Sequence, residues 1–170
     1  MNLIVAVDNR WGIGKNNNLL FRLPKDMAFF RQTTTGKVVV MGANTFLSLP
    51  KGALPNRTTI VLDNSGATHS GTTTVSSVEE LFQQLANYNT DDVYVCGGAM
   101  VYKLLLPYCA KALITKVQAD GQAQVFAPNL DEDSNWQLVE SSEQIEDGQY
   151  KIVFCTYVNK QILNCVCVHK

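Results

Sequence analysis

Histidine is scarce in this chain of 170 residues: the only two are His69, inside a loop-like stretch, and His169, next to the C-terminus. A serine or cysteine hydrolase needs a histidine that takes the proton of its nucleophile. Neither histidine suits that role, so we expect no hydrolase of this kind. If the protein is an enzyme that transfers protons, we expect a carboxylate side chain to do so.

An excess of basic charge, long apolar runs and paired cysteines are also missing. The chain has 14 lysine and arginine residues against 15 aspartate and glutamate residues and no basic cluster, which argues against nucleic acid as a partner. The sequence contains no run of twenty apolar residues, the length that a membrane-spanning helix needs. Five scattered cysteines indicate reduced thiols and a cytoplasmic location, and the N-terminus lacks the charged start of a signal peptide.

Two groups of residues are not expected to form sites. Cys165, Cys167 and His169 resemble a metal cluster only superficially, because a zinc site needs four ligands with wider cysteine spacing. We therefore predict no bound metal, and we assign residues 159–170 to a C-terminal tail of unknown role. Two acidic clusters are expected in solvated turns: Asp131, Glu132 and Asp133, and Glu143, Glu146 and Asp147.

Short apolar runs alternate with helical stretches along residues 1–158, which we expect to form one domain. Strands separated by single helices indicate a parallel sheet covered on both faces, and the final run of strands indicates antiparallel pairs at one edge. The Gly/Asn-rich segment 11–18 is expected to be a loop. The predicted strands are Leu3–Val7, Lys37–Met41, Thr58–Leu62, Thr72–Val75, Val93–Cys96, Ala112–Val117, Trp136–Ser141 and Lys151–Val158. The predicted helices are Pro24–Thr34, Asn44–Ser48, Ser77–Asn87 with a capping box at Ser77 and Glu80, and Ala99–Leu106.

Asp26 is the most informative carboxylate in the sequence. It follows Pro24, which suits the first turn of a helix, and it shares a helix face with Phe30 four residues later. A carboxylate on an apolar face must be paired, hydrogen-bonded or protonated. Asp26 is therefore a candidate proton donor or cation anchor; the alternative is that it only stabilises the helix N-terminus.

Three further features could bind an anionic ligand. Gly97 and Gly98 join a strand to a helix and leave backbone N–H groups where a phosphate could dock, although a tight turn is the alternative. Asn44 and Thr45 open a second helix of the same kind, and two such turns would suit a dinucleotide. Arg57 precedes a strand and either grips a carboxylate or is an ordinary surface arginine.

Five segments together resemble the dihydrofolate reductase family, in the order and at the spacing of that family. The segments are Ala6-Val7-Asp8 with Gly12-Ile13-Gly14-Lys15; Leu23-Pro24-Lys25-Asp26-Met27 with Phe30; Val39-Val40-Met41-Gly42 with Thr45-Phe46; Leu54-Pro55-Asn56-Arg57; and Val95-Cys96-Gly97-Gly98 with Val101-Tyr102. One such motif would be weak evidence, but five in register are highly specific. The resemblance covers residues 1–158.

The resemblance implies a fold and a reaction. The implied fold is α/β, a mixed, mostly parallel eight-stranded sheet flanked by four helices, with a cleft between two lobes. The implied reaction is the reduction of 7,8-dihydrofolate to tetrahydrofolate by hydride transfer from NADPH, which supports one-carbon metabolism and makes such enzymes antifolate targets. A cytoplasmic monomer is expected.

The resemblance also implies roles for individual residues. Asp26 would bind the pterin N3 and 2-amino group and promote protonation at N5, with Thr115 supporting it and Arg57 holding the glutamate α-carboxylate. The expected substrate contacts are Ile4, Val5, Met27, Phe30, Leu49, Leu54, Arg57 and Cys96. The expected cofactor contacts are Ala6, Ile13, Gly14, Leu19, Gly42, Ala43, Asn44, Thr45, Ser48, Leu62, Asp63, Asn64, Cys96, Gly97, Gly98, Ala99, Met100, Val101 and Tyr102. The paired glycines carry a cis peptide in the family.

The chain departs from the family pattern at several positions. Phe21, assigned to the catalytic group, stands where the family usually has tryptophan, so an indole N–H that orders water near the substrate is missing. Ala43, Asp63 and Ser76 offer no cation to the adenosine 2′-phosphate, and an acid near a ribose favours NADH. NADPH is therefore expected with reduced preference over NADH. Gln124 lies where the family has Gly-Asp-Thr, so closure of the facing loop 14–19 is expected to differ.

Two other functions remain open at this point. A reductase of the same fold that acts on a ribosylated pyrimidine in flavin synthesis would have no use for Asp26 and Arg57 at this spacing. A weakly active folate- or nucleotide-binding protein would accommodate the missing tryptophan and basic residues, because a fold alone does not prove activity.

Overall fold

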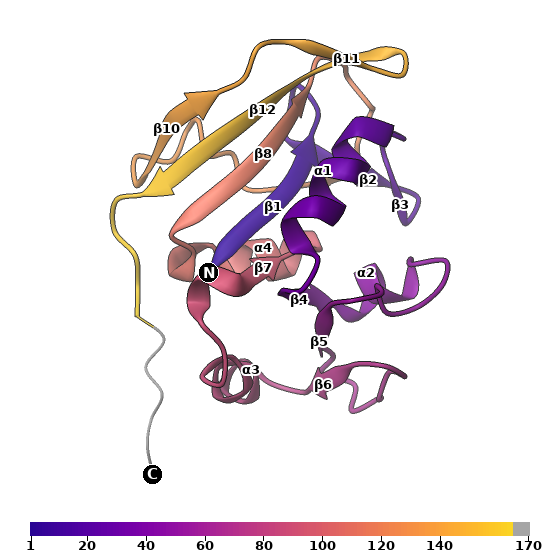
Figure 1. Ribbon diagram of the computed structural model, residues 1–170, viewed down its shortest axis with the longest axis vertical. Helices are drawn as coiled ribbons and strands as arrows, with labels where there is room; N and C mark the ends of the chain where they lie inside the picture. Colours follow the sequence, from indigo (N-terminus) through magenta and orange to yellow (C-terminus); the bar gives the residue numbers. More distant parts are fainter. Residues whose placement is uncertain (165–170) are drawn as a thin grey trace.

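A mixed β-sheet forms the centre of the molecule in the computed structural model, which describes residues 1–164 (Figure 1). Its strands in spatial order are β10 (Trp136–Ser141), β12 (Tyr150–Asn159), β8 (Lys111–Val117), β1 (Asn2–Val7), β7 (Val93–Val95), β4 (Val38–Gly42), β5 (Thr58–Leu62) and β6 (Thr73–Val75). A short strand β11 (Ile145–Asp147) also pairs with β12. The pairs from β8 to β6 are parallel, whereas β12 runs antiparallel to β8, β10 and β11. The expected mixed, mostly parallel sheet is confirmed.

Four α-helices flank this sheet within the described residues. They are α1 (Pro24–Thr34), α2 (Ala43–Leu47), α3 (Val78–Leu85) and α4 (Ala99–Leu105). Two 3-10 turns, Thr90–Asp92 and Leu106–Tyr108, precede β7 and follow α4. A second, three-stranded sheet consists of β3 (Asn18–Leu19), β2 (Gly12–Lys15) and β9 (Val125–Phe126).

The helices cover both faces of the main sheet, as the alternation of side chains along β4 illustrates. Val38 and Val40 belong to the core that includes residues of α3 and α4, whereas Val39 and Met41 pack with Phe46 of α2. These side chains are almost fully buried on both faces, which is typical of a central parallel strand. Helix α1 lies on the same face as α2, because Asp26 bonds to Thr115, and the strand registers place Thr115 on the same face as Val39.

The structure corrects the expected local structure at three places. Segment 11–18, expected to be a loop, contains β2 and the first residue of β3, because β2 pairs both with β3 and with the distant strand β9. Helix α4 ends at Leu105 and not at Leu106, because Leu106 belongs to the 3-10 turn that follows the helix. The capping box of α3 is incomplete: the Ser77 hydroxyl accepts the N–H of Glu80, but the Glu80 carboxylate accepts the N–H of Ser76, not that of Ser77.

The expectation of solvated turns is confirmed for Asp131 and Glu132, which are exposed in a turn, but it was wrong for Asp147 of the second cluster. Asp147 ends β11 and is only 1% exposed. Asp131 accepts hydrogen bonds from Lys116 over 2.7 Å and from Tyr157 over 2.6 Å. Both carboxylates find partners far away in the sequence, which the local composition does not indicate.

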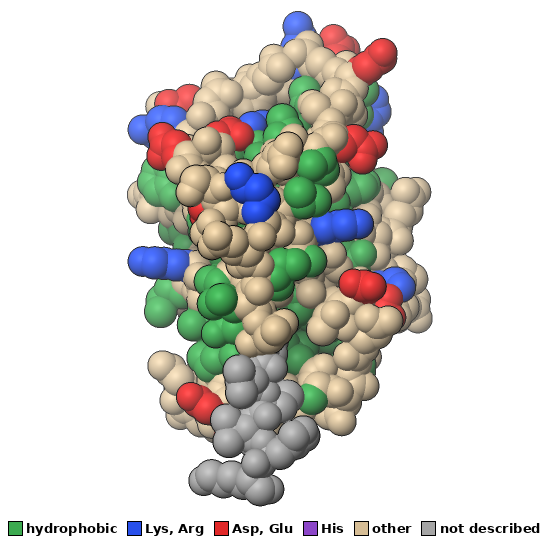
Figure 2. Space-filling view, turned by 90° about the vertical axis from the view of Figure 1, so that its left-hand side faces the viewer, with side chains coloured by type: hydrophobic (Ala, Val, Ile, Leu, Met, Phe, Trp, Pro, Cys, Tyr) green, Lys and Arg blue, Asp and Glu red, His purple; other side chains and the backbone are tan. Residues whose placement is uncertain are grey.

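The molecular surface shows no gathering of basic side chains on the face that carries β10 and the end of β12 (Figure 2). Lysine and arginine side chains are spread over this face and alternate with acidic and apolar ones. Among residues 1–164, no helix combines the length and the apolar character that crossing a membrane requires.

Candidate active site

Asp26 meets Thr115 between α1 and the sheet. Asp26 lies in the first turn of α1, and Thr115 is a buried residue of β8 whose register partner on β1 is Ala6. The Thr115 hydroxyl donates a hydrogen bond to Asp26 Oδ1 over 2.6 Å. Burial raises the pKa of Asp26, the hydrogen bond from Thr115 opposes that rise, and the negative charge of Asp147 adds to it. Asp26 therefore takes up a proton more readily than an exposed aspartate.

Large apolar side chains are exposed on α1, which carries Asp26, and on β3 and α2. Leu19 on β3 is 82% exposed, Met27 on α1 is 57% exposed and Leu47 on α2 is 67% exposed. Met27 directly follows Asp26 and is one of the expected substrate contacts, so a ligand bound at Asp26 can cover its exposed side chain. Of the other expected substrate contacts, Ile4 is buried, and Val5, Phe30, Leu49, Leu54 and Cys96 are partly buried.

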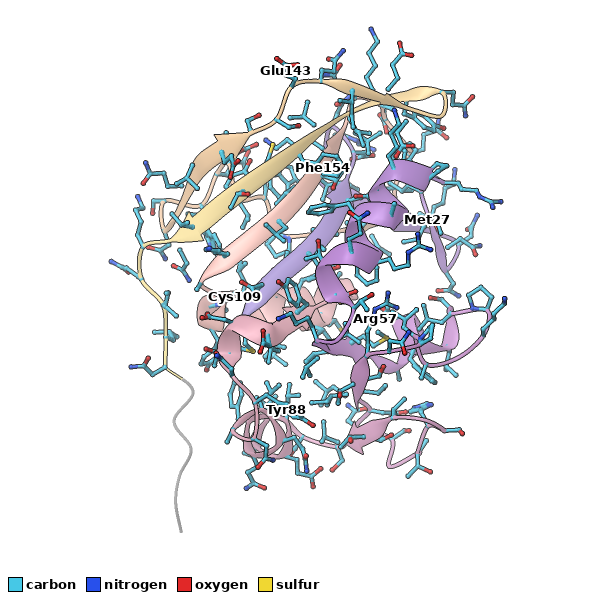
Figure 3. The ribbon with its side chains drawn as sticks, viewed as in Figure 1. Met27, Arg57, Tyr88, Cys109, Glu143 and Phe154 are labelled. Atoms are coloured by element: carbon cyan, nitrogen blue, oxygen red, sulfur yellow. The ribbon has the colours of Figure 1, made fainter. Side chains whose placement is uncertain are left out.

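Arg57 lies beyond the C-terminal end of α1, whereas Met27 lies near the start of the helix (Figure 3). Arg57 Cζ is 5.8 Å from the ring centroid of Phe30, and Arg57 Nη2 donates to Thr35 Oγ1 over 3.4 Å. Arg57 Nε is buried and has no hydrogen-bond partner within residues 1–164. Burial lowers the pKa of Arg57, but a guanidinium stays cationic in proteins. The orphaned Nε–H marks a place where a carboxylate would bind.

The separation between Asp26 and Arg57 sets the length that a ligand needs to contact both side chains. Thr35, which contacts Arg57, follows Asp26 by nine residues, or about 13 Å along a helix. A ligand that reaches both side chains needs a hydrogen-bonding head at one end and an anionic group at the other. Phe30, between them in sequence, offers an aromatic face to the middle of such a ligand.

The two predicted phosphate-binding turns are neighbours in the structure. The Gly42 N–H donates to the carbonyl of Gly97 over 2.8 Å. A Cβ atom on Gly98 would lie 3.2 Å from Thr45 Oγ1, and Gly97 has a φ of 124°, which favours glycine. The Gly97–Gly98 peptide is cis, as expected. The backbone at the starts of α2 and α4 lacks a side-chain cap from the described residues, so its N–H groups can serve a phosphate.

The expected cofactor residues fall on adjacent strand ends. Segment 42–48 begins at the last residue of β4, and segment 62–64 begins at the last residue of β5. Segment 96–102 begins directly after β7. Because β4 pairs with both β5 and β7, the carboxyl ends of these parallel strands meet at one edge of the sheet. Ala6 lies near the end of β1, which pairs with β7. This edge can therefore hold an extended dinucleotide.

Tyr102 connects α4 to the strand that carries Ala6. Its hydroxyl donates to the carbonyl of Ile4 over 2.9 Å, and the residue is 3% exposed. Burial raises the pKa of Tyr102 well above its ordinary value, so the hydroxyl remains a neutral donor. Burial likewise raises the pKa of Cys96 to about 12, which keeps its thiol protonated.

Strand β2, which carries Ile13 and Gly14, is hydrogen-bonded to the loop between β8 and β9. The Gln124 N–H donates to the carbonyl of Gly14 over 2.9 Å, and Gln124 Oε1 accepts the N–H of Asn16 over 3.0 Å. A neutral amide thus makes the contact between the loops. The Asp8 carboxylate also links them, because it accepts the N–H groups of Gly12 and Gly121 over 2.7 and 3.0 Å.

Phe21 packs in an apolar corner next to Ala6. Its ring meets that of Tyr150 edge-on, with the centroids 4.7 Å apart. A hydrocarbon ring has no hydrogen-bond donor, so Phe21 cannot orient a water molecule as an indole would.

The chain that follows β5 carries acidic side chains at this edge of the sheet. Asp63 Oδ1 accepts the N–H of Ser65, and Asp63 Oδ2 is 2.7 Å from His69 Nε2. Hydrogen bonds from Ser65 and His69 lower the pKa of Asp63 to about 2. Glu80 accepts the N–H and the hydroxyl of Ser76. The sequence from position 58 to position 102 contains no lysine or arginine, so His69 is the one cationisable side chain in that segment.

No three histidine, cysteine, aspartate or glutamate side chains come together as a metal site in the described part of the chain. The cluster of Cys165, Cys167 and His169 lies outside the described residues. The Asp26–Thr115 pair, the Arg57 site and the glycine turns thus form the candidate active site.

Comparison with known proteins agrees with this geometry. The family model described as dihydrofolate reductase matches residues 1–159. A dihydrofolate reductase of Bacillus subtilis (strain 168) is 34% identical, over 94% of this chain and 95% of the relative, and one of Haemophilus influenzae is 37% identical, over 88% and 86%. A solved structure, the Enterococcus faecalis dihydrofolate reductase complexed with NADP(H) and RAB-propyl, is 32% identical with a TM-score of 0.83 and covers 93% of this chain and 95% of that one. The chain belongs to the dihydrofolate reductase family.

Proposed function

We propose that this protein reduces 7,8-dihydrofolate to tetrahydrofolate by hydride transfer from NADPH and so supports one-carbon metabolism. The observation that carries the proposal is the half-buried Asp26 carboxyl group, hydrogen-bonded to Thr115 at one end of α1, with the orphaned Arg57 Nε–H at the other end. Dihydrofolate has the matching groups, a pterin with N–H donors and a glutamate with carboxylates.

Asp26 is the proposed catalytic acid. Its carboxyl group binds the pterin N3 and 2-amino group and promotes protonation at N5, which makes the neighbouring C6 electron-poor enough to accept a hydride. Burial raises the pKa of Asp26, and this rise favours the protonated form nearer to neutral pH. Thr115 orients the carboxyl group through its hydroxyl. Phe21, the third residue of the proposed catalytic group, shields this region without donating a hydrogen bond.

The remaining substrate contacts fix the ligand along α1. Arg57 binds the glutamate α-carboxylate through its fork of N–H groups, which matches a carboxylate bidentately. Phe30 packs on the ligand rings, and Met27, Leu49 and Leu54 complete an apolar wall that excludes water.

NADPH supplies the hydride when it is bound along the edge formed by β1, β4, β5 and β7. Gly97, Gly98 and Thr45 hold its phosphates, because the missing Cβ atoms let a phosphate approach the backbone. Ala6 and Ile13 offer backbone groups to the nicotinamide carboxamide, and Tyr102 lies beside the ring.

We propose further that the preference for NADPH over NADH is weak. Ala43, Asp63 and Ser76 replace the cations that would neutralise an adenosine 2′-phosphate, and the carboxylates of Asp63 and Glu80 both lie in this region. Catalytic efficiencies measured with NADPH and with NADH test this proposal, and a strong preference for NADPH would contradict it.

The decisive experiment for the function is the NADPH-dependent reduction of dihydrofolate, followed by the loss of cofactor absorbance. Rapid loss that requires dihydrofolate supports the proposal, and no loss would refute it. A ribosylated pyrimidine substrate of flavin synthesis serves as the matched negative control. We also propose that the protein is a monomer and that it is located in the cytoplasm; the free thiols of Cys96 and Cys155 agree with that location.

A further inference from the structure

Asp147 caps the N-terminus of α1 from a distant part of the chain. The helix begins after Leu23, whose side chain makes no capping hydrogen bond. Asp147 Oδ1 accepts the N–H of Lys25 over 3.0 Å, and Asp147 Oδ2 accepts the N–H of Asp26, also over 3.0 Å. Lys25 Nζ donates to the carbonyl of Glu146 over 2.7 Å. Three hydrogen bonds therefore join the β11–β12 hairpin to the start of the helix.

Because Asp147 is buried, its carboxylate needs these hydrogen bonds. The residue is 1% exposed at the end of β11, directly before the turn that leads into β12. A buried carboxylate is costly unless hydrogen-bond donors or cations satisfy it. Here the two N–H groups and the positive end of the helix dipole do so. One of these N–H groups belongs to Asp26 itself.

We infer that Asp147 is a positioning residue for Asp26: its carboxylate fixes the backbone of the first turn of α1 and places a second negative charge beside the Asp26 side chain. The other group that acts on Asp26 is the hydroxyl of Thr115 from β8. The charge of Asp26 in turn contributes to the raised pKa of Tyr102 on α4. The ammonium group of Lys25 is bound to a hairpin carbonyl and does not pair with Asp26. The catalytic part of this inference rests on the proposed function, whereas the effect on protonation does not.

Removal of the Asp147 charge has two consequences of the same sign. The repulsion that disfavours ionised Asp26 disappears, and the positive helix N-terminus is no longer neutralised. Both changes favour the charged form of Asp26, so its pKa falls. A residue with a merely structural role would change stability and leave this pKa where it was.

The test is a carboxyl ¹³C NMR titration of Asp26 in the full chain without ligands, with the resonance assigned by its loss in Asp26→Asn. We expect Asp147→Asn and Asp147→Ser to lower the pKa of Asp26 by about 0.5 or more. Asp147→Glu keeps the charge and should retain most of the native value. Glu146→Gln, which neutralises an exposed carboxylate in the same hairpin, is the matched control and should leave the pKa unchanged.

A second readout is the pH dependence of hydride transfer from NADPH to dihydrofolate. Above the pKa of Asp26, a decrease of this pKa by about 0.5 in Asp147→Asn should slow the reaction about threefold, and the rate should match the native rate at low pH. An unchanged or higher pKa of Asp26 in the neutral variants, or an equal fall in Asp147→Glu, would overturn the inference. The titration needs no turnover, so it decides on Asp147 even if the protein does not reduce dihydrofolate.

Discussion

Replacement of Arg57 by lysine should weaken dihydrofolate binding without a comparable loss of turnover. The variant keeps the positive charge but loses the fork whose Nε–H has no partner among the described residues and whose Nη2 makes only a long bond to Thr35. A hydrogen bond to a charged group contributes about 1.5–3 kcal/mol. Because lysine can keep one of the two bonds, we expect the loss of one, which corresponds to a rise in Kd of about tenfold to about a hundredfold.

The assay compares two ligands and two variants. Kd is measured for dihydrofolate and for a diaminopyrimidine inhibitor that has no glutamate, in Arg57→Lys and in the control Arg31→Lys, which alters an exposed arginine on α1. Only the combination of Arg57→Lys and dihydrofolate should show the large loss. Equal weakening of both ligands would refute a carboxylate site at Arg57, as would no weakening of either.

Three further predictions concern Asp26 and the cofactor. Thr115→Val removes the hydrogen bond that lowers the pKa of Asp26, so an NMR titration should show this pKa rising further; a fall would contradict the assigned geometry. Because the folded state holds the Asp26 proton more tightly than the unfolded state, stability should decrease as pH rises from the ordinary value of 3.8 through the raised pKa. Asp26→Asn should abolish that decrease in urea unfolding curves, and an unaltered pH dependence would argue against a raised pKa. Ala43→Arg should increase the ratio of catalytic efficiencies for NADPH and NADH about tenfold, since one charge-assisted bond to the 2′-phosphate contributes about 1.5 kcal/mol; an unchanged ratio would place the 2′-phosphate elsewhere.

The sequence predicts the elements whose signals are local. The β-branched run at 38–40 and the Pro24 helix start are recognisable without tertiary information, and both lie within a residue of their predicted positions. Strands β2 and β9 escape prediction because they pair with each other although more than a hundred residues separate them in the sequence. Gly12 and Gly14 gave the segment the composition of a loop, although their backbone pairs in a sheet.

The same division applies to the site. Asp26, Arg57 and the glycine pair are predictable because their neighbours in sequence form motifs. Asp147 is not, since its acidic neighbours and the following glycine suggest a solvated turn, while its partner N–H groups lie about 120 residues away. The pairing of Asp63 with His69 is hidden for a related reason: the bond depends on the path of the loop between β5 and β6.

The role of Asp26 is tested most directly by the rate of dihydrofolate reduction in Asp26→Asn across the pH range. At neutral pH the variant should be slower than the native protein by about a hundredfold or more, which is the usual contribution of a positioned acid. The deficit should shrink as pH falls, because solvent then supplies the N5 proton. A native rate with a native pH profile in a correctly folded Asp26→Asn variant would contradict the proposal that Asp26 promotes N5 protonation.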